Sequence, residues 1–139
     1  MTSKILEVIQ LLEHAIGPSR KLDQAIGIAL EILPTKPFES DAPCERLEGM
    51  YWVFGRKDTP NGPVEERWSR NPPFYTFMLD ARIHGEDIIG SSEQKQIEGQ
   101  PVFWVAVHRM PKGKMSIAGR GRSEALARRI AALKAINSK

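Results

Sequence analysis

The residues with the clearest chemical potential form one glycine- and arginine-rich stretch near the C-terminal end, Gly119-Arg120-Gly121-Arg122-Ser123. A glycine loop before a helix can bind phosphate, because free backbone amides and the helix dipole favour anions there. The complete phosphate-loop patterns are absent, since no Gly-x-x-x-x-Gly-Lys-Ser/Thr occurs and Glu124 replaces the third glycine of Gly-x-Gly-x-x-Gly. The stretch therefore favours a strand-to-helix turn flanked by arginines over a nucleotide pocket.

The other reactive side chains are too scattered to predict a catalytic or metal-binding set. Cys44 has no histidine near it in sequence, and the adjacent acids Glu65-Glu66 and Glu86-Asp87 would point to opposite faces of a strand. The histidines lack partners at metal-ligand spacing and fall on three different predicted elements: His14, His84 and His108. We therefore expect no cofactor, no metal and no enzymatic activity.

Positive charge is concentrated in the last quarter of the chain. The net charge is +3, but residues 109–139 contain nine Lys and Arg with Glu124 as the only acid, whereas residues 1–108 have a net charge of −5. Clustered cations attract phosphate or an acidic protein surface, and a solvated helix face is the plainer alternative. The residues expected to bind are Lys112, Arg120, Arg122 and Arg128.

Length and composition predict one α+β domain over residues 1–139. A chain of 139 residues with 41% hydrophobic and 27% charged residues is typical of a single globular domain. No apolar run approaches the ~18 residues of a membrane span, and the N-terminal residues lack a signal peptide's apolar stretch. We expect a cytoplasmic protein without membrane contact, and the single cysteine excludes an internal disulfide.

Apolar residues at helical spacing predict a helical hairpin over residues 1–33. Gly17-Pro18 ends the first helix, Ser19 caps the second, and Pro34 ends it. The first helix, capped by Thr2 or Ser3, has the clearest stripe, formed by Ile5, Val8, Ile9, Leu12 and Ile16. Residues 34–49 are rich in proline and polar side chains, which indicates a connecting loop.

Residues 50–139 are predicted to form a small, mostly antiparallel sheet and a C-terminal helix. Residues 50–54 and 64–68 make a hairpin around the turn Pro60–Pro63, with the second strand at an edge. Residues 75–84 read as a short helix capped by Thr76, with Leu79 and Ile83 turned inward. Strands at 102–107 and 114–118 precede a helix from Ser123 to about Ile136. Together these elements predict an α+β sandwich.

Aromatic residues alternate with arginines in the predicted hairpin. Because successive strand residues face opposite ways, Tyr51 and Val53 cannot share a face with Trp52 and Phe54. One of these two sets must therefore meet something other than the helices. Stacked aromatics and arginines suit a single-stranded nucleic acid or a peptide, although such aromatics are more often core residues.

The C-terminal strand and helix resemble the end of a double-stranded-RNA-binding domain, which carries Gly-x-Gly-x-Ser, two lysines, Ala-Lys and a pair of alanines. The matching framework residues are Gly119, Gly121, Ser123, Ala127, Arg128, Ala131 and Ala132. Glu124 and Ala125 stand in place of the paired lysines, so the resemblance leaves Arg128 as the phosphate contact. The same pattern of glycines, serine cap and alanines also suits any helix packed closely on a sheet.

Three longer blocks resemble small prophage-encoded proteins of alphaproteobacteria related to the phage αβα-sandwich domain. The blocks are Gly17-Pro18-Ser19-Arg20-Lys21-Leu22-Asp23, then Tyr75-Thr76 with Leu79-Asp80-Ala81, and the alanine-rich residues 125–135. This resemblance implies a fold and a phage origin but no activity. We expect a binding module whose basic C-terminal face takes a host or phage macromolecule, either an acidic protein surface or a nucleic acid. A structured-RNA-binding module is the alternative.

Overall fold

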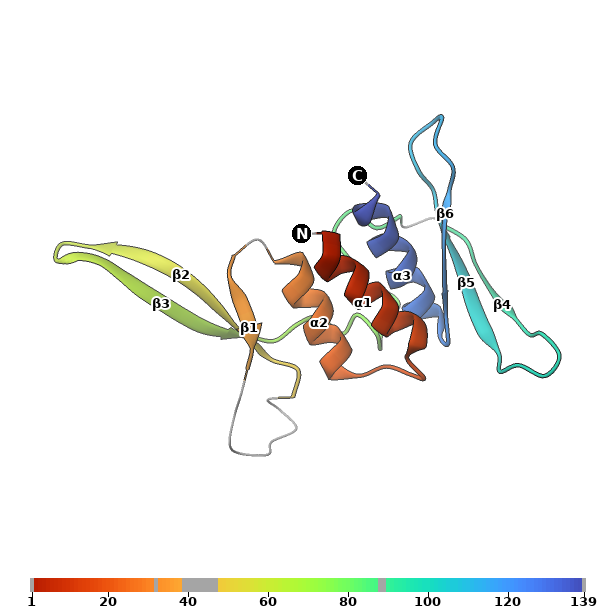
Figure 1. Ribbon diagram of the computed structural model, residues 1–139, viewed down its shortest axis with the longest axis horizontal. Coiled ribbons are helices and arrows are strands. Elements are labelled where there is room, and N and C mark those ends of the chain that lie inside the picture. Colours follow the sequence, from red (N-terminus) through yellow and green to blue (C-terminus); the bar gives the residue numbers. More distant parts are fainter. Residues whose placement is uncertain (1, 32, 39–47, 88–89, 139) are drawn as a thin grey trace.

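The computed structural model describes residues 2–31, 33–38, 48–87 and 90–138, which form an α+β fold of helices between two small sheets (Figure 1). The helices are α1 (Thr2–His14), α2 (Arg20–Leu30) and α3 (Glu124–Asn137). The first sheet contains β1 (Thr35–Pro37), β2 (Tyr51–Thr59) and β3 (Gly62–Arg70). The second contains β4 (Ser92–Lys95), β5 (Phe103–His108) and β6 (Ile117–Gly121).

The predicted α+β class is confirmed, but the strands divide into two antiparallel sheets instead of one. Their orders are β1-β2-β3 and β4-β5-β6. The predicted edge position of the second hairpin strand is confirmed, since β3 ends its sheet. Two strands were not predicted: β1 lies in the expected loop 34–49, and the polar sequence of β4 carries no strand pattern. Cys44 lies outside the described residues.

The helical hairpin forms where the apolar stripes predict it, with shorter helices. The Ser19 hydroxyl accepts a hydrogen bond from the Leu22 N–H at 3.0 Å, as expected of an N-cap. Helix α1 ends before the predicted Ile16, which is 87% exposed, and α2 ends before Leu33. The core that joins α1, α2 and α3 contains Val8, Ile9, Leu12, Ile26, Ile83, Leu126, Ile130, Ala132 and Leu133.

Helix α3 packs closely on the second sheet because small residues line both surfaces. The Ser123 hydroxyl accepts from the Leu126 N–H at 3.2 Å, which confirms the predicted start of the helix. Ala127 and Ala131 are buried against β5 and β6. A Cβ at Gly119 would lie 2.4 Å from both the Ala127 carbonyl oxygen and the Ala131 nitrogen, so only glycine fits there.

The helix predicted over residues 75–84 is wrong. The segment consists of turns, because its carbonyl groups serve another element: the Arg129 guanidinium of α3 donates to Tyr75, Met78 and Leu79 at 3.1, 2.8 and 2.5 Å. Thr76 does not cap a helix of its own, since its hydroxyl donates to Asp23 at 2.8 Å. Ile83 is buried as predicted, but Leu79 is 46% exposed.

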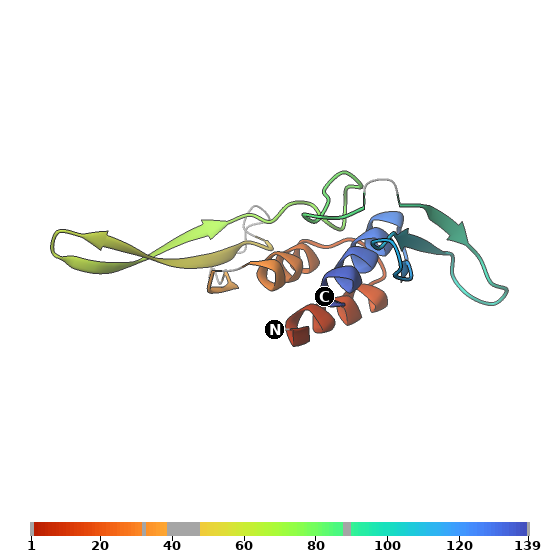
Figure 2. The ribbon, with the colours of Figure 1, turned by 90° about the horizontal axis from the view of Figure 1, so that it is seen from above.

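The β2–β3 hairpin starts on α2 and then leaves the body of the molecule. Tyr51 and Val53 are buried, and the Tyr51 hydroxyl donates to Glu31 at 2.9 Å. Trp52 and Phe54 stay partly exposed, so the predicted division into two faces is confirmed. Beyond these residues the two strands project as a twisted ribbon (Figures 1 and 2).

We expect Gly119→Ala to lower the free energy of unfolding by about 2–3 kcal/mol, because the added methyl group would strike the backbone of α3. Urea denaturation followed by circular dichroism measures the change. Gly17→Ala is the matched control, since nothing lies within 4 Å of a Cβ there, and its effect should stay near zero. Equal stability of the two variants would contradict this packing.

Candidate functional site

Four of the C-terminal cations are paired with acidic residues, three of which come from the first part of the chain. Arg109 pairs with Asp87 at 2.9 Å, and Lys134 pairs with Glu13 at 3.3 Å. The other two pairs are Arg128 with Glu124 at 3.4 Å and Arg129 with Glu86 at 2.6 Å. The excess of positive charge in this region therefore overstates the charge available to a partner.

Arg128, expected to be a binding residue, is partly buried and engaged by groups of the protein itself. Its guanidinium donates to the Gly90 carbonyl at 3.0 Å and to the Ser92 hydroxyl at 2.9 Å. Glu124 also accepts from Ser92, at 2.5 Å, and faces Arg128. The expected free cation at the start of α3 is thus a link between α3 and the start of β4.

Arg129, the next residue, is fully buried and has a structural role. Its three backbone contacts and the Glu86 carboxylate use the whole guanidinium fork. Burial raises the pKa of Glu86 and lowers the pKa of Arg129, because both groups lose hydration. The helix phase distinguishes the two arginines: Arg129 lies three residues after Leu126 and four before Leu133, both fully buried, so it falls on the inward face and Arg128 beside it.

The remaining described cations of this region are unpaired and follow one strand. In the described part of residues 109–139, no ion pair involves Lys112, Lys114, Arg120 or Arg122, which we call the β6 basic row. Lys112 and Lys114 lie in the turn before β6, Arg120 is in the strand, and Arg122 follows it. The side chains of all four residues are exposed to solvent. The structure thus leaves Lys112, Arg120 and Arg122 exposed along β6 and its preceding turn, pairs Arg128 with Glu124, and adds Lys114 to the row.

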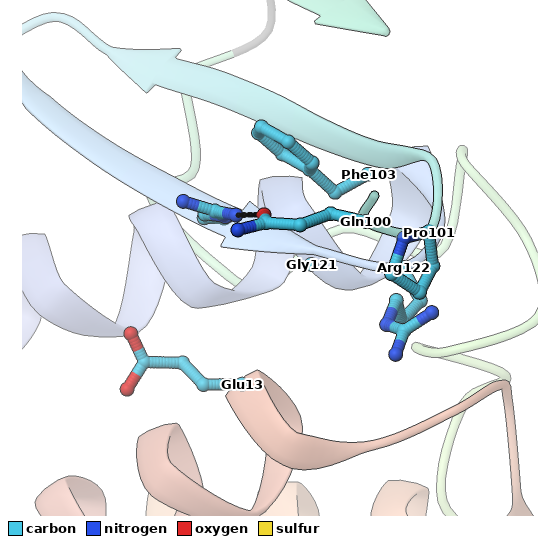
Figure 3. A pocket seen from close by; sticks show the side chains of 7 residues that line it. Glu13, Gln100, Pro101, Phe103, Gly121 and Arg122 are labelled. Carbon is cyan, nitrogen blue, oxygen red and sulfur yellow. Dashed lines mark hydrogen bonds between the residues drawn. The ribbon is translucent and has the colours of Figure 1, made fainter. Parts of the chain in front are cut away.

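A shallow hollow of about 270 Å³ lies at the Arg122 end of the β6 basic row (Figure 3). The Arg120 guanidinium is stacked 3.7 Å from the centre of the Phe103 ring and donates to the Gln100 side chain at 3.3 Å. Figure 3 shows Glu13 on α1 across the hollow from Gln100 and Phe103. Because Lys134 pairs with Glu13, this carboxylate is balanced.

Phe103 and Gln100 were not predicted as site residues. Arg120 lies directly opposite Val105 on β5, so its side chain and that of Phe103 share the sheet face that points away from α3. A stacked guanidinium keeps its hydrogen-bonding edge free and loses little conformational entropy on binding an anion. The sequence shows both residues, but only the register of β5 and β6 places them together.

The chemistry of this surface is electrostatic. Guanidinium and ammonium groups on an open edge bind phosphate or carboxylate oxygens. The described histidines do not come together: His14 Nδ1 lies 2.8 Å from the Gln10 carbonyl, and His108 Nδ1 lies 3.4 Å from the Asp87 nitrogen. Among the described residues no three potential metal ligands form a group.

Comparisons with family models, curated proteins and solved structures found no match to this chain. Within the described residues, none of the helices has the length and apolar character needed to cross a bilayer.

We expect Arg129→Ala to lower the free energy of unfolding by about 3–5 kcal/mol, because it leaves the buried Glu86 carboxylate without its cation and removes the guanidinium donor from the Tyr75, Met78 and Leu79 carbonyl groups. Arg122→Ala is the control and should change stability by less than about 0.5 kcal/mol, since its side chain is exposed. Urea titration of both variants compares them. A mild effect of Arg129→Ala would show that the 75–79 segment does not depend on this guanidinium.

Proposed function

We propose that this chain is a non-enzymatic binding module, a phage or prophage accessory protein acting in the cytoplasm, whose basic C-terminal face binds an acidic macromolecule. The observation that carries the proposal is the β6 basic row, in which four cations lack a carboxylate partner. Arg109, Arg128, Arg129 and Lys134 all have one. The three sequence blocks similar to prophage proteins support the phage assignment.

Among acidic partners, a nucleic acid backbone fits the row best. The four cations extend along an exposed strand and its preceding turn, and a phosphate backbone likewise offers charges at regular intervals. Arg120 and Arg122 can each donate to phosphate oxygens as a planar fork, and Lys112 and Lys114 add point charges at the far end. Four phosphate contacts imply affinity that falls about 50- to 150-fold between about 50 and 200 mM salt.

The structured-RNA alternative depends on a different place, the N-terminus of α3. A double-stranded-RNA contact there would need a free cation beside Ser123, and Arg128 is held by Gly90, Ser92 and Glu124. Glu124 would also face the phosphates. The contacts of Arg128 therefore favour the β6 basic row over the start of α3.

The test is fluorescence anisotropy with labelled single-stranded DNA, single-stranded RNA and duplex RNA at about 50 and 200 mM salt. We expect Arg120→Gln with Arg122→Gln to weaken binding of the single strands at least tenfold and to halve the salt slope, because two of four phosphate contacts are lost. The control pair Lys4→Gln with Lys21→Gln removes the same charge from exposed positions on α1 and α2 and should have little effect.

Three results would count against a nucleic acid bound at the β6 basic row. Equal weakening by both variant pairs would mean that net charge alone, and not the β6 basic row, drives binding. Preference for duplex RNA, lost in Arg128→Gln and not in the Arg120 and Arg122 variant, would move the site to α3. No binding of any nucleic acid at low salt would leave an acidic protein as the partner of this face.

A further inference from the structure

The outer part of the β2–β3 hairpin is an isolated two-stranded ribbon. Strand β1 pairs only with Tyr51–Val53 of β2, so residues 54–67 pair only with each other among the described strands. The ribbon stands clear of the helices and of the second sheet (Figures 1 and 2). Two strands alone are marginally stable in water, and an open strand edge is a template for further pairing.

The charges of this ribbon do not suit a nucleic acid. Its three cations are balanced by three acids: Arg56, Lys57 and Arg67 against Asp58, Glu65 and Glu66. Strand β3 also exposes large apolar side chains, with Val64 in the ribbon 51% exposed and Trp68 next to it 42% exposed. Val64 and Trp68 are four residues apart on a strand and so lie on the same face. A neutral, partly apolar edge is typical of contact with protein.

We propose that the β3 edges of two copies of this chain pair antiparallel about a two-fold axis at Glu66, which makes a continuous six-stranded sheet. A two-fold axis normal to the sheet leaves each side chain on the same face of the sheet. Because successive residues alternate between the faces, an even-numbered residue of β3 can lie opposite only an even-numbered residue of the second copy, and an odd-numbered residue opposite only an odd-numbered one. Centred on Glu66, the register places Glu65 opposite Arg67 of the second copy and Val64 opposite Trp68 of the second copy. Symmetry repeats each pair, so two opposite-charge pairs and two apolar pairs form.

Other registers lack this complementarity. Centring the axis on Glu65 or on Arg67 also places two like charges at the centre, and it puts no glutamate opposite an arginine. Centring it on Trp68 pairs Glu66 with Arg70, but Arg70 already pairs with Glu31 at 2.8 Å. In the proposed register the two copies of Glu66 meet at the axis, and Lys57, 4.0 Å from Glu66 across the ribbon, offsets their repulsion.

The edge of β3 fits a second copy of this chain. When two copies run antiparallel, Glu65 of each copy lies opposite Arg67 of the other, so the charges of the edge complement each other. An unrelated strand would need its own arginine and glutamate at matching spacing, whereas a copy supplies both. Edge-to-edge pairing of short strands buries less surface than the ~800 Å² per partner of standard interfaces. We therefore expect a reversible dimer that forms at micromolar concentration.

Sedimentation velocity at protein concentrations from about 1 to about 200 μM tests the pairing, together with substitutions that reverse the charge at Glu65 or at Arg67. We expect the full chain to shift from one to two copies over this range. Glu65→Arg alone and Arg67→Glu alone should each weaken dimerisation at least tenfold, because each places like charges opposite each other twice. An equimolar mixture of the two variants restores opposite charges at both contacts and should dimerise like the original chain. Lys4→Glu on α1 is the charge-matched control and should dimerise normally.

The mixture separates the interface from damage to the ribbon. Circular dichroism shows whether each variant keeps its folded ribbon, and an equimolar mixture of folded variants that stays monomeric would overturn the proposed register. A chain that stays monomeric up to the highest concentration, or variants that dimerise as well as the original, would also overturn it. These results are independent of nucleic acid binding, which involves β6.

Discussion

The buried guanidinium of Arg129 is the contact on which the arrangement of this fold depends. It joins α3 to the segment that follows the first sheet by satisfying three carbonyl groups and Glu86. A connection without regular structure can lie on the core only if its polar backbone groups find partners. Asp23 and Thr76 secure the same segment to α2. The two sheets lie on opposite sides of the helices, and this connection is one of the contacts that join the end of the first sheet to the core (Figure 1).

The sequence-based predictions were correct where the deciding interactions join residues close together in the chain, and wrong where they join residues far apart. Ser19 and Ser123 cap their helices through bonds to residues three positions away, and both were predictable. Residues 75–84 have local features of a helix, but their carbonyl groups bond to a side chain about fifty residues away. A local pattern cannot reveal that competition. For the same reason the polar strand β4 was missed, since its pairing with β5 and not its composition defines it.

The sequence indicated the sign and region of the candidate surface and three of its four exposed cations, Lys112, Arg120 and Arg122, but not the pairing of Arg128 or the exposure of Lys114. The excess of cations after residue 108 is visible in the composition. Which of them stay free depends on Glu13, Glu86 and Asp87, acids from the negatively charged first part of the chain that the fold brings to the C-terminal segment. Part of the positive charge of the C-terminal segment is therefore paired within the protein. The exposed remainder is narrower than the composition suggests and follows a strand instead of covering a helix.

The two proposed surfaces have different electrostatic characters and lie at opposite ends of the molecule (Figure 1). The ribbon carries balanced charges, so two copies approach without the repulsion that two β6 basic rows would cause. Pairing through the ribbon leaves both rows free and holds them far apart, since each nine-residue strand spans about 30 Å. A long polyanion can reach both rows, whereas a short one reaches a single row. Binding of the second row then becomes intramolecular, and the strength of binding depends on the length of the partner.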